Sequence, residues 1–432
     1  MKLANNTNNK KNIATLLIII EVLLIASPSQ MLGTFLSPLV LLLLGITSGI
    51  IIISLSRSSF AETTTIPKKE EKYLQILLYI IGCVFLFFTI KGVIDKFPID
   101  VKYSDIIPQV NKMLTRFLAA EMPYQPITDW GWEMFPTYMP LQWMPFAIPQ
   151  LLHFDYRYFA FFVWVATGIM LVSSPFFNQN SRFYRLTFIL LSVIYVYKQS
   201  LIFNCTYEIM MAAYYMLLLY SFRSKSDVIK GLALSLCLLS RYSVLLFVPL
   251  YFLFLFLNNG AKKTINTGLV IILMFLVFYI LPFMTQDPMI FIKSYSYHSM
   301  AALGEWQHFE GGALPVHLES KLGVACYFYK FYPGQLIDKL KALQHVHLFL
   351  CILSVTLCGI YYYLNNKLDK IKTPTLFLIG AFNIYITIFY CFIQIPYQYL
   401  FIVPAFISIT TLLYLGNLNA EKPNSPIDTN KI

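Results

Sequence analysis

The sequence predicts an all-α fold, a polytopic membrane helical bundle of about twelve spans. Of its 432 residues, 58% are hydrophobic and only 12% are charged, and the mean hydropathy is +0.64. Soluble domains carry about 25% charged residues. The apolar residues also gather in runs close to the roughly 20 residues that a helix needs to cross a bilayer. These observations exclude a soluble cytosolic enzyme and a disordered chain.

Twelve apolar runs are the candidate spans. In chain order they are residues 13–28, 33–54, 75–94, 157–174, 186–201, 207–221, 229–240, 243–258, 265–283, 346–363, 375–393 and 398–415. The first run could be a signal peptide, because Lys10 and Lys11 precede it. Ser27-Pro28-Ser29 is a poor cleavage site, however, so we expect an uncleaved span.

Two apolar stretches are predicted to depart from a single straight span. Residues 136–152 contain four prolines, and a proline inside a helix removes a hydrogen bond and clashes with the preceding turn. We therefore expect an interfacial or re-entrant segment there. Residues 229–258 carry Arg241 near their middle, where a lone cation would be strongly unfavourable in the bilayer. We expect two short helices that meet at Arg241, on the outer surface.

The distribution of Lys and Arg predicts that both ends of the chain are cytoplasmic. The net charge is +11, and 19 of the 32 basic residues, counting Lys230, fall in the short segments assigned to the cytoplasm. Those segments are residues 1–12, 55–74, 175–185, 222–228, 259–264, 364–374 and the tail from 416. Because cytoplasmic loops are enriched in basic residues, the positive charge indicates membrane lipids as partners and no nucleic acid.

Two long outer segments, residues 95–156 and 284–345, collect polar side chains. Within the first, residues 106–120 have the apolar spacing of an amphipathic helix lying on the membrane. Asp105 stands at the start of this helix, where an aspartate is commonly a helix cap. Asp100, five residues earlier, is equally interpretable as a solvated loop charge. Both remain candidates for a reactive carboxylate.

Further candidates lie in the second outer segment and in two shorter outer turns. Lys293 and His298 belong to the former, and Glu208 and Arg241 to the latter. Each also has a structural interpretation, Arg241 as an interfacial cation and Glu208 as a carboxylate at a helix N-terminus. The sequence contains no nucleotide-binding loop, hydrolase elbow or zinc motif. The sequence therefore identifies no metal ligand and no certain cofactor, and it leaves a divalent metal open without indicating one.

Two classes of function fit polar side chains on one face of such a bundle. One is a membrane enzyme that takes a lipid-linked substrate, and the other is a transporter or flippase. A secondary transporter is expected to show repeated halves and polar residues near the middle of the membrane. We find no internal repeat, and most polar residues outside the cytoplasmic loops belong to the outer segments. This distribution favours the enzyme.

A sparse set of motifs carries a family resemblance over residues 75–260. The motifs are Tyr103-Ser104-Asp105-Ile106, Ala119-Ala120-Glu121-Met122-Pro123-Tyr124, Tyr138-Met139-Pro140-Leu141, Asp155-Tyr156-Arg157, Asn204-Cys205-Thr206-Tyr207-Glu208 and Leu239-Ser240-Arg241-Tyr242-Ser243, followed by Pro249. In this order they resemble the GT-C superfamily of integral-membrane glycosyltransferases, which use polyprenyl-phosphate sugars. The chain departs from the pattern at Ala120, where a glycine is usual, and in having two spans before the expected first one.

The resemblance implies a mannosyltransferase-like transfer of a hexose from a polyprenyl-phosphate sugar, the donor substrate, to a lipid, glycan or protein acceptor. It implies an aspartate that accepts the proton of the acceptor hydroxyl, which here is Asp105 or Asp100. It implies a cation for the phosphate, for which Arg241 is the candidate. It also implies a carboxylate for acceptor binding or for a metal, for which Glu208 is the candidate. The remaining candidates for substrate binding are Tyr124, Tyr138, Lys293 and His298. A lipid-linked polysaccharide polymerase and a secondary transporter remain the alternatives.

The predicted organisation has four parts. They are an N-terminal two-span hairpin with its cytoplasmic loop (1–74), a GT-C-like catalytic membrane module with the outer loop 95–156 (75–260), a C-terminal membrane module with the outer loop 284–345 (261–415), and a cytoplasmic tail (416–432). We expect the chain in the bacterial inner (plasma) membrane, with its active site facing outward.

Cysteine labelling in intact cells tests this topology. A membrane-impermeant maleimide should modify the Asp129→Cys variant and spare the Lys69→Cys variant, because the first position is predicted outside and the second inside. Both should react after the cells are permeabilised, which serves as the control. The opposite pattern in intact cells would place the polar segments in the cytoplasm.

Overall fold

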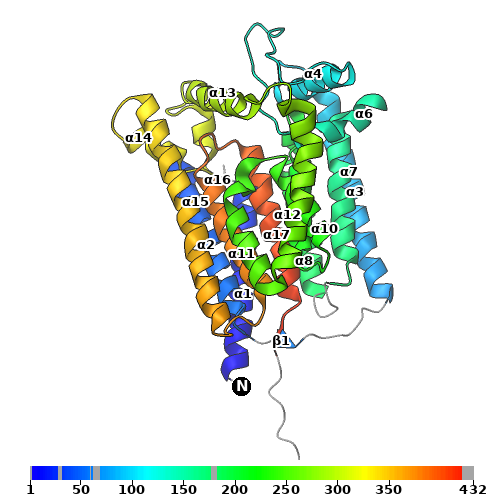
Figure 1. The fold of residues 1–432 in the computed structure, drawn as a ribbon, viewed down its shortest axis with the longest axis vertical. Coiled ribbons are helices and arrows are strands. Elements are labelled where there is room, and N and C mark those ends of the chain that lie inside the picture. The colour runs from blue at the N-terminus through cyan, green and yellow to red at the C-terminus, as the bar shows by residue number, and fades with distance from the viewer. Residues whose placement is uncertain (1, 28–31, 59, 62–68, 177–181, 421–432) are drawn as a thin grey trace, which may run out of the picture.

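The computed structural model describes residues 2–27, 32–58, 60–61, 69–176 and 182–420, and nearly all of its regular structure is helical (Figure 1). The predicted all-α class is confirmed. The described strands are two residues long, β1 (Phe60–Ala61) and β2 (Asn419–Ala420), and they pair antiparallel. The predicted cytoplasmic loop at 62–68 and the predicted tail beyond residue 420 lie outside the described residues.

Eight helices within the described ranges are long and apolar enough to cross a membrane, as a multi-pass membrane protein requires. They are Gly33–Leu55, Glu70–Lys96, Tyr156–Ser173, Tyr242–Asn259, Ala261–Met284, Leu336–Lys367, Pro374–Cys391 and Gln398–Gly416. A ninth apolar helix, Ile209–Ser221, is shorter. The coarse prediction of a polytopic helical membrane protein is therefore supported, whereas the count of twelve spans stays a prediction.

Every predicted span coincides with a helix or with two consecutive helical segments. The helices are α1 (Lys2–Ala26), α2 (Gly33–Leu55), α3 (Lys69–Lys96), α7 (Tyr156–Ser173), α8 (Arg182–Lys198), α9 (Ile209–Ser221), α10 (Asp227–Leu238), α11 (Val248–Asn259), α12 (Ala261–Phe275), α15 (Leu336–Lys367), α16 (Pro374–Cys391) and α17 (Ile402–Gly416). Shorter segments extend some of them: the 3-10 turns η4 (Ser200–Asn204), η5 (Tyr242–Phe247) and η8 (Gln398–Phe401), and the π-helical segment η6 (Leu276–Met284).

The two long connections form a cover layer, residues 97–155 and 285–335, at one end of the bundle. Its helical segments are α4 (Ile106–Leu118), α5 (Pro140–Trp143), η2 (Met144–Phe146), α6 (Ala147–Leu151), α13 (Ile290–Glu305), η7 (Val316–Ser320) and α14 (Ala325–Phe331). In Figure 1, α4, α6 and α13 lie at the top, whereas the start of α1 and strand β1 lie at the bottom. Both polar segments therefore face the same side of the bundle, opposite the N-terminus.

The predicted helix and helix breaks in the irregular stretches are confirmed, whereas their position at the membrane surface stays a prediction. Residues 136–152 form the short segments α5, η2 and α6 and make no continuous helix. The helix α10 ends at Leu238, and the extended Arg241 (φ −150°, ψ 140°) separates it from η5. The amphipathic helix is α4, which buries Ile107, Val110 and Met113 on its apolar face.

Glycines bring α2 and α16 into close contact near one side of the bundle. A Cβ atom at Gly49 would lie 2.4 Å from Cγ1 of Ile384 and 2.8 Å from the carbonyl oxygen of Gly380. A Cβ atom at Gly45 would likewise overlap the side chain of Thr387. Small residues allow helix backbones to approach closely in membrane proteins, where dispersion contacts drive helix association. This packing joins the predicted N-terminal hairpin to the predicted C-terminal module.

Gly49→Val is expected to destabilise the protein, because overpacking a close helix contact costs about 1–3 kcal/mol. The measurement is the apparent melting temperature of the purified protein in detergent. Gly92→Val on α3 is the matched control, since a Cβ atom there has no neighbour within 4 Å. Equal melting temperatures for the two variants would contradict the close contact between α2 and α16.

Candidate functional site

A cavity of about 1360 Å³ lies between the cover layer and the neighbouring ends of the bundle helices. The cover layer contributes the start of α4, the segment 132–142, α13 and His317. The bundle contributes the turns at 198–208 and 240–246, part of α15 and the segment 389–400. Five of the eight predicted site residues line it: Asp105, Tyr138, Glu208, Arg241 and His298. The cavity is therefore the candidate functional site.

Asp105 lines this cavity, and its carboxylate does not cap the helix that follows. It occupies the position before α4, but its side chain makes no capping hydrogen bond. The hydroxyl of Ser104 instead accepts a hydrogen bond from the backbone N–H of Ile106, at 3.2 Å. Burial raises the pKa of Asp105; a hydrogen bond from its own backbone N–H offsets part of this rise, and the nearby charge of Glu305 adds to it. The structure thus removes the cap interpretation and leaves a carboxylate that is a stronger base than usual.

Asp100 is engaged in a local turn. Its Oδ1 accepts a hydrogen bond from the backbone N–H of Lys102 at 2.8 Å. The residue is exposed and does not line the cavity. Of the two candidate bases, Asp105 therefore has the better placement.

Glu208 and Arg241 form an ion pair at the bundle side of the cavity. Arg241 Nη2 donates to Glu208 Oε2 at 2.5 Å, and the side chains are 21% and 2% exposed, respectively. Arg241 Nε and Glu208 Oε1 are buried and have no hydrogen-bond partner among the described residues. Arg241 lines the cavity and its side chain stays partly exposed beside the pair, so an anionic ligand in the cavity can approach it.

Tyr138 and His298 complete the polar lining contributed by the cover layer. Tyr138 packs edge-on against Tyr207, with ring centroids 6.5 Å apart. Burial lowers the pKa of His298, and the positive charge of Arg241 lowers it further. A pKa below the ordinary 6.5 leaves this imidazole neutral at pH 7, so it can donate one hydrogen bond and accept another.

The structure does not bring Tyr124 and Lys293 to the cavity. The Tyr124 hydroxyl donates to the carbonyl oxygen of Tyr138 at 2.9 Å and accepts from Nε1 of Trp143 at 3.1 Å. Tyr124 is thus buried behind the cavity wall and holds Tyr138 in place. Lys293 pairs with Asp287 at 2.5 Å on the exposed face of α13. Residue type alone could not distinguish a cation on the cavity face from one on the opposite face.

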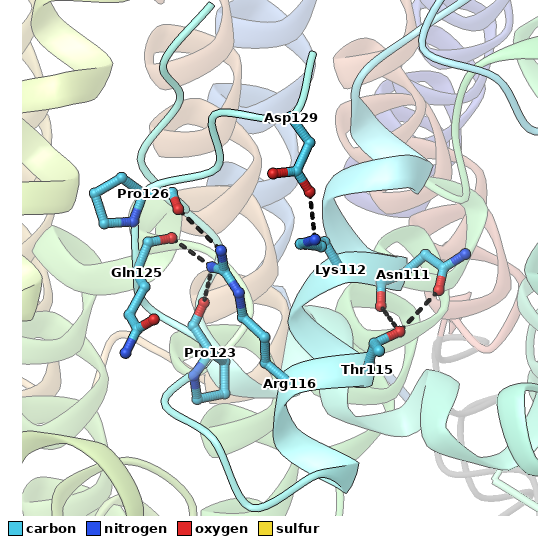
Figure 2. Close-up of polar contacts among 8 residues, drawn as sticks. All are labelled: Asn111, Lys112, Thr115, Arg116, Pro123, Gln125, Pro126 and Asp129. Carbon is cyan, nitrogen blue, oxygen red and sulfur yellow. Dashed lines mark hydrogen bonds and ion pairs between the residues drawn. The ribbon is translucent and has the colours of Figure 1, made fainter.

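A clamp from α4 holds the loop that supplies part of the cavity wall (Figure 2). The Arg116 guanidinium donates to three carbonyl oxygens of this loop, those of Pro123 (3.4 Å), Gln125 (2.6 Å) and Pro126 (2.9 Å). Lys112, one turn earlier, pairs with Asp129. The loop then closes on itself through a backbone bridge between Ile127 and Met134. Met134 and Trp132 line the cavity, so the contacts of Arg116 and Lys112 fix the position of this part of its wall.

Residues that the sequence did not single out as a site also line the cavity. Glu305 at the end of α13 and His317 in η7 approach each other, with Nε2 of His317 3.3 Å from Oε2 of Glu305. The ring of Tyr397 lies edge-on to His317, with centroids 4.5 Å apart. These residues come from three separate segments, and their spacing in the sequence matches no ligand motif. Only the folded arrangement reveals them.

Comparison of the chain with protein-family models, with curated proteins and with solved structures finds no match. The function is therefore inferred from the side chains that the fold brings together.

Glu208→Gln is expected to lower stability strongly, because removing one partner of a buried ion pair costs about 3–5 kcal/mol. The measurement is again the apparent melting temperature in detergent. Lys293→Gln, which breaks the exposed pair with Asp287, should leave the melting temperature unchanged, since exposed pairs contribute little. A similar melting temperature for both variants would show that the Glu208–Arg241 pair is not a structural anchor.

Proposed function

We propose that the protein is a membrane glycosyltransferase of the GT-C type, which transfers a hexose such as mannose from a polyprenyl-phosphate sugar to a lipid, glycan or protein acceptor. The observation that carries the proposal is the shared cavity of Asp105 and Arg241. A base for an acceptor hydroxyl and a cation for a phosphate are the two groups that this reaction needs. The twelve-span topology, with the cavity on the outer face, belongs to the same proposal.

In the proposed reaction Asp105 accepts the proton of the acceptor hydroxyl as its oxygen attacks the anomeric carbon of the donor. The bond between that carbon and the phosphate oxygen breaks, and polyprenyl phosphate leaves with the bonding electrons. Arg241 stabilises the negative charge of this leaving group, as preorganised cations do at developing anions. Glu208 holds the guanidinium in position, which makes it a positioning residue.

The apolar lining of the cavity supports a lipid-linked donor. Leu201, Leu245 and Leu348 line the cavity and are about half exposed. They offer an accessible apolar surface in the same cavity as the polar groups. A polyprenyl chain could lie along them while its phosphate reaches Arg241.

Purified protein incubated with a panel of labelled polyprenyl-phosphate hexoses and membrane lipids tests the proposal. The expected result is glycosylated acceptor together with an equal amount of free polyprenyl phosphate. Proteoliposomes that take up a solute and release no polyprenyl phosphate would instead identify a transporter. Elongation of a lipid-linked glycan chain would identify the polymerase alternative.

Asp105→Asn is expected to lower turnover by about 10²–10⁴-fold, the range that general-base catalysis contributes. The folded state raises the pKa of Asp105, so the charged carboxylate destabilises the fold above that pKa and the amide removes this effect. The melting temperature at neutral pH should therefore be unchanged or higher. Only the ionised carboxylate can accept a proton, so wild-type turnover should fall as the pH drops through the raised pKa of Asp105.

Asp100→Asn is the matched control, since its carboxylate accepts only a local backbone hydrogen bond that is 2.8 Å long. Near-normal turnover is expected for this variant. If Asp100→Asn loses turnover while Asp105→Asn keeps it, the base lies five residues upstream. If both variants retain turnover, neither aspartate is the base.

A further inference from the structure

Three potential metal ligands lie close together beside the cavity, between the end of α13 and η7. They are Glu305, His308 and His317, and one ligand atom of each lies within 4.8 Å of the other two. Glu305 and His317 line the cavity. His308 lies in the turn after α13 and is 52% exposed. The cluster thus stands at the rim of the site without overlapping Asp105 or Arg241.

The distances within this cluster approach those between two ligands of one metal ion. Zinc binds nitrogen and carboxylate oxygen at 2.0–2.2 Å in tetrahedral geometry, which places two ligand atoms about 3.4 Å apart. Nε2 of His317 lies 3.3 Å from Oε2 of Glu305, and Nδ1 of His308 lies 3.9 Å from the same oxygen. All three ligand atoms lie within 4.8 Å of one another, so the exposed side chain of His308 has to move inward to complete the set around one ion.

The carboxylate oxygen shared by both histidines is otherwise unsatisfied. Oε2 of Glu305 is buried and has no hydrogen-bond partner among the described residues. Its 3.3 Å approach to His317 is therefore a close contact without hydrogen-bond geometry. A buried carboxylate oxygen without a donor is unfavourable, and a bound cation would satisfy it.

The surroundings of both histidines resemble an outer shell of metal ligands. Histidines that bind metals usually donate their second ring N–H to a carboxylate or carbonyl oxygen. Nε2 of His308, the nitrogen that faces away from Glu305, lies 3.7 Å from Oε1 of Glu310. The edge-on ring of Tyr397 restricts the orientation of His317.

We propose that Glu305, His308 and His317 form a binding site for a divalent transition-metal ion of the zinc class. His308 binds through Nδ1, His317 through Nε2 and Glu305 through Oε2. Two imidazoles favour zinc, copper, iron or nickel over magnesium and calcium, which prefer oxygen ligands alone. Three protein ligands leave one tetrahedral position for water or for a substrate oxygen in the cavity. This site does not depend on the glycosyltransferase proposal.

Zinc binding by the tag-free, full-length protein tests the site without donor or acceptor. After dialysis against a chelator and then against Zn²⁺, the wild type should retain one zinc ion per chain, measured by elemental analysis. Co²⁺ in place of Zn²⁺ should give the visible absorption of a four-coordinate site. An excess of Mg²⁺ should not displace either ion.

Variants of exposed residues make the test specific. His308→Gln should abolish retention of zinc, and Glu310→Gln should weaken the affinity about 10- to 100-fold, as loss of an outer-shell partner does. His153→Asn, at an exposed histidine with φ 56°, is the control and should bind zinc like the wild type. Asparagine tolerates that backbone conformation. Each variant should melt like the wild type in the absence of metal.

Two results would overturn the site. One is a wild-type protein that retains no zinc after dialysis. The other is a His308→Gln variant that binds zinc with the stoichiometry and affinity of the wild type. Loss of glycosyl transfer has no bearing on either measurement, so failure of the metal site and failure of the proposed function are distinguishable.

Discussion

The ion pair between Glu208 and Arg241 is the interaction on which the site depends. Each residue stands at a break between two helical segments, Glu208 before α9 and Arg241 between α10 and η5. A buried carboxylate or guanidinium is strongly unfavourable alone, and pairing offsets much of that desolvation. The two breaks are therefore held together at one end of the bundle. Nε of Arg241 has no hydrogen-bond partner among the described residues, and both residues of the pair line the cavity.

The cover layer supplies the second half of the site and is held by polar contacts of a different kind. Arg116 and Lys112 clamp the loop after α4 through its carbonyl oxygens and Asp129 (Figure 2). Buried Tyr124 fixes Tyr138 from behind. Because the contacts of the clamp are exposed while the Glu208–Arg241 pair is buried, the cover layer is the part of the site better suited to adjust to a substrate. Asp105 belongs to this layer, and Arg241 to the bundle.

Several features of the fold could be predicted from residue type and spacing. Four prolines predicted that residues 136–152 are no single helix, and Arg241 in the middle of an apolar stretch predicted the break between α10 and η5. Both predictions rest on large local costs, that of a proline inside a helix and that of an unpaired arginine inside the bilayer. The prediction of α4 from its apolar spacing was also correct, because burying one apolar face stabilises an amphipathic helix. The orientation of a side chain within such an element depends on smaller energies and on distant neighbours.

By itself, the sequence determined the helical membrane class, the positions of the helices and the segments that hold the polar residues. Hydrophobic burial and backbone hydrogen bonding act locally and are strong enough to set these features. Only the tertiary structure decided that Asp105 is uncapped and faces the cavity while Asp100 closes a turn. Only the tertiary structure placed Lys293 outside the cavity and brought His317 next to Glu305, which lies twelve residues earlier in the chain. These outcomes depend on which faces of separate segments meet, and no spacing within one segment encodes that.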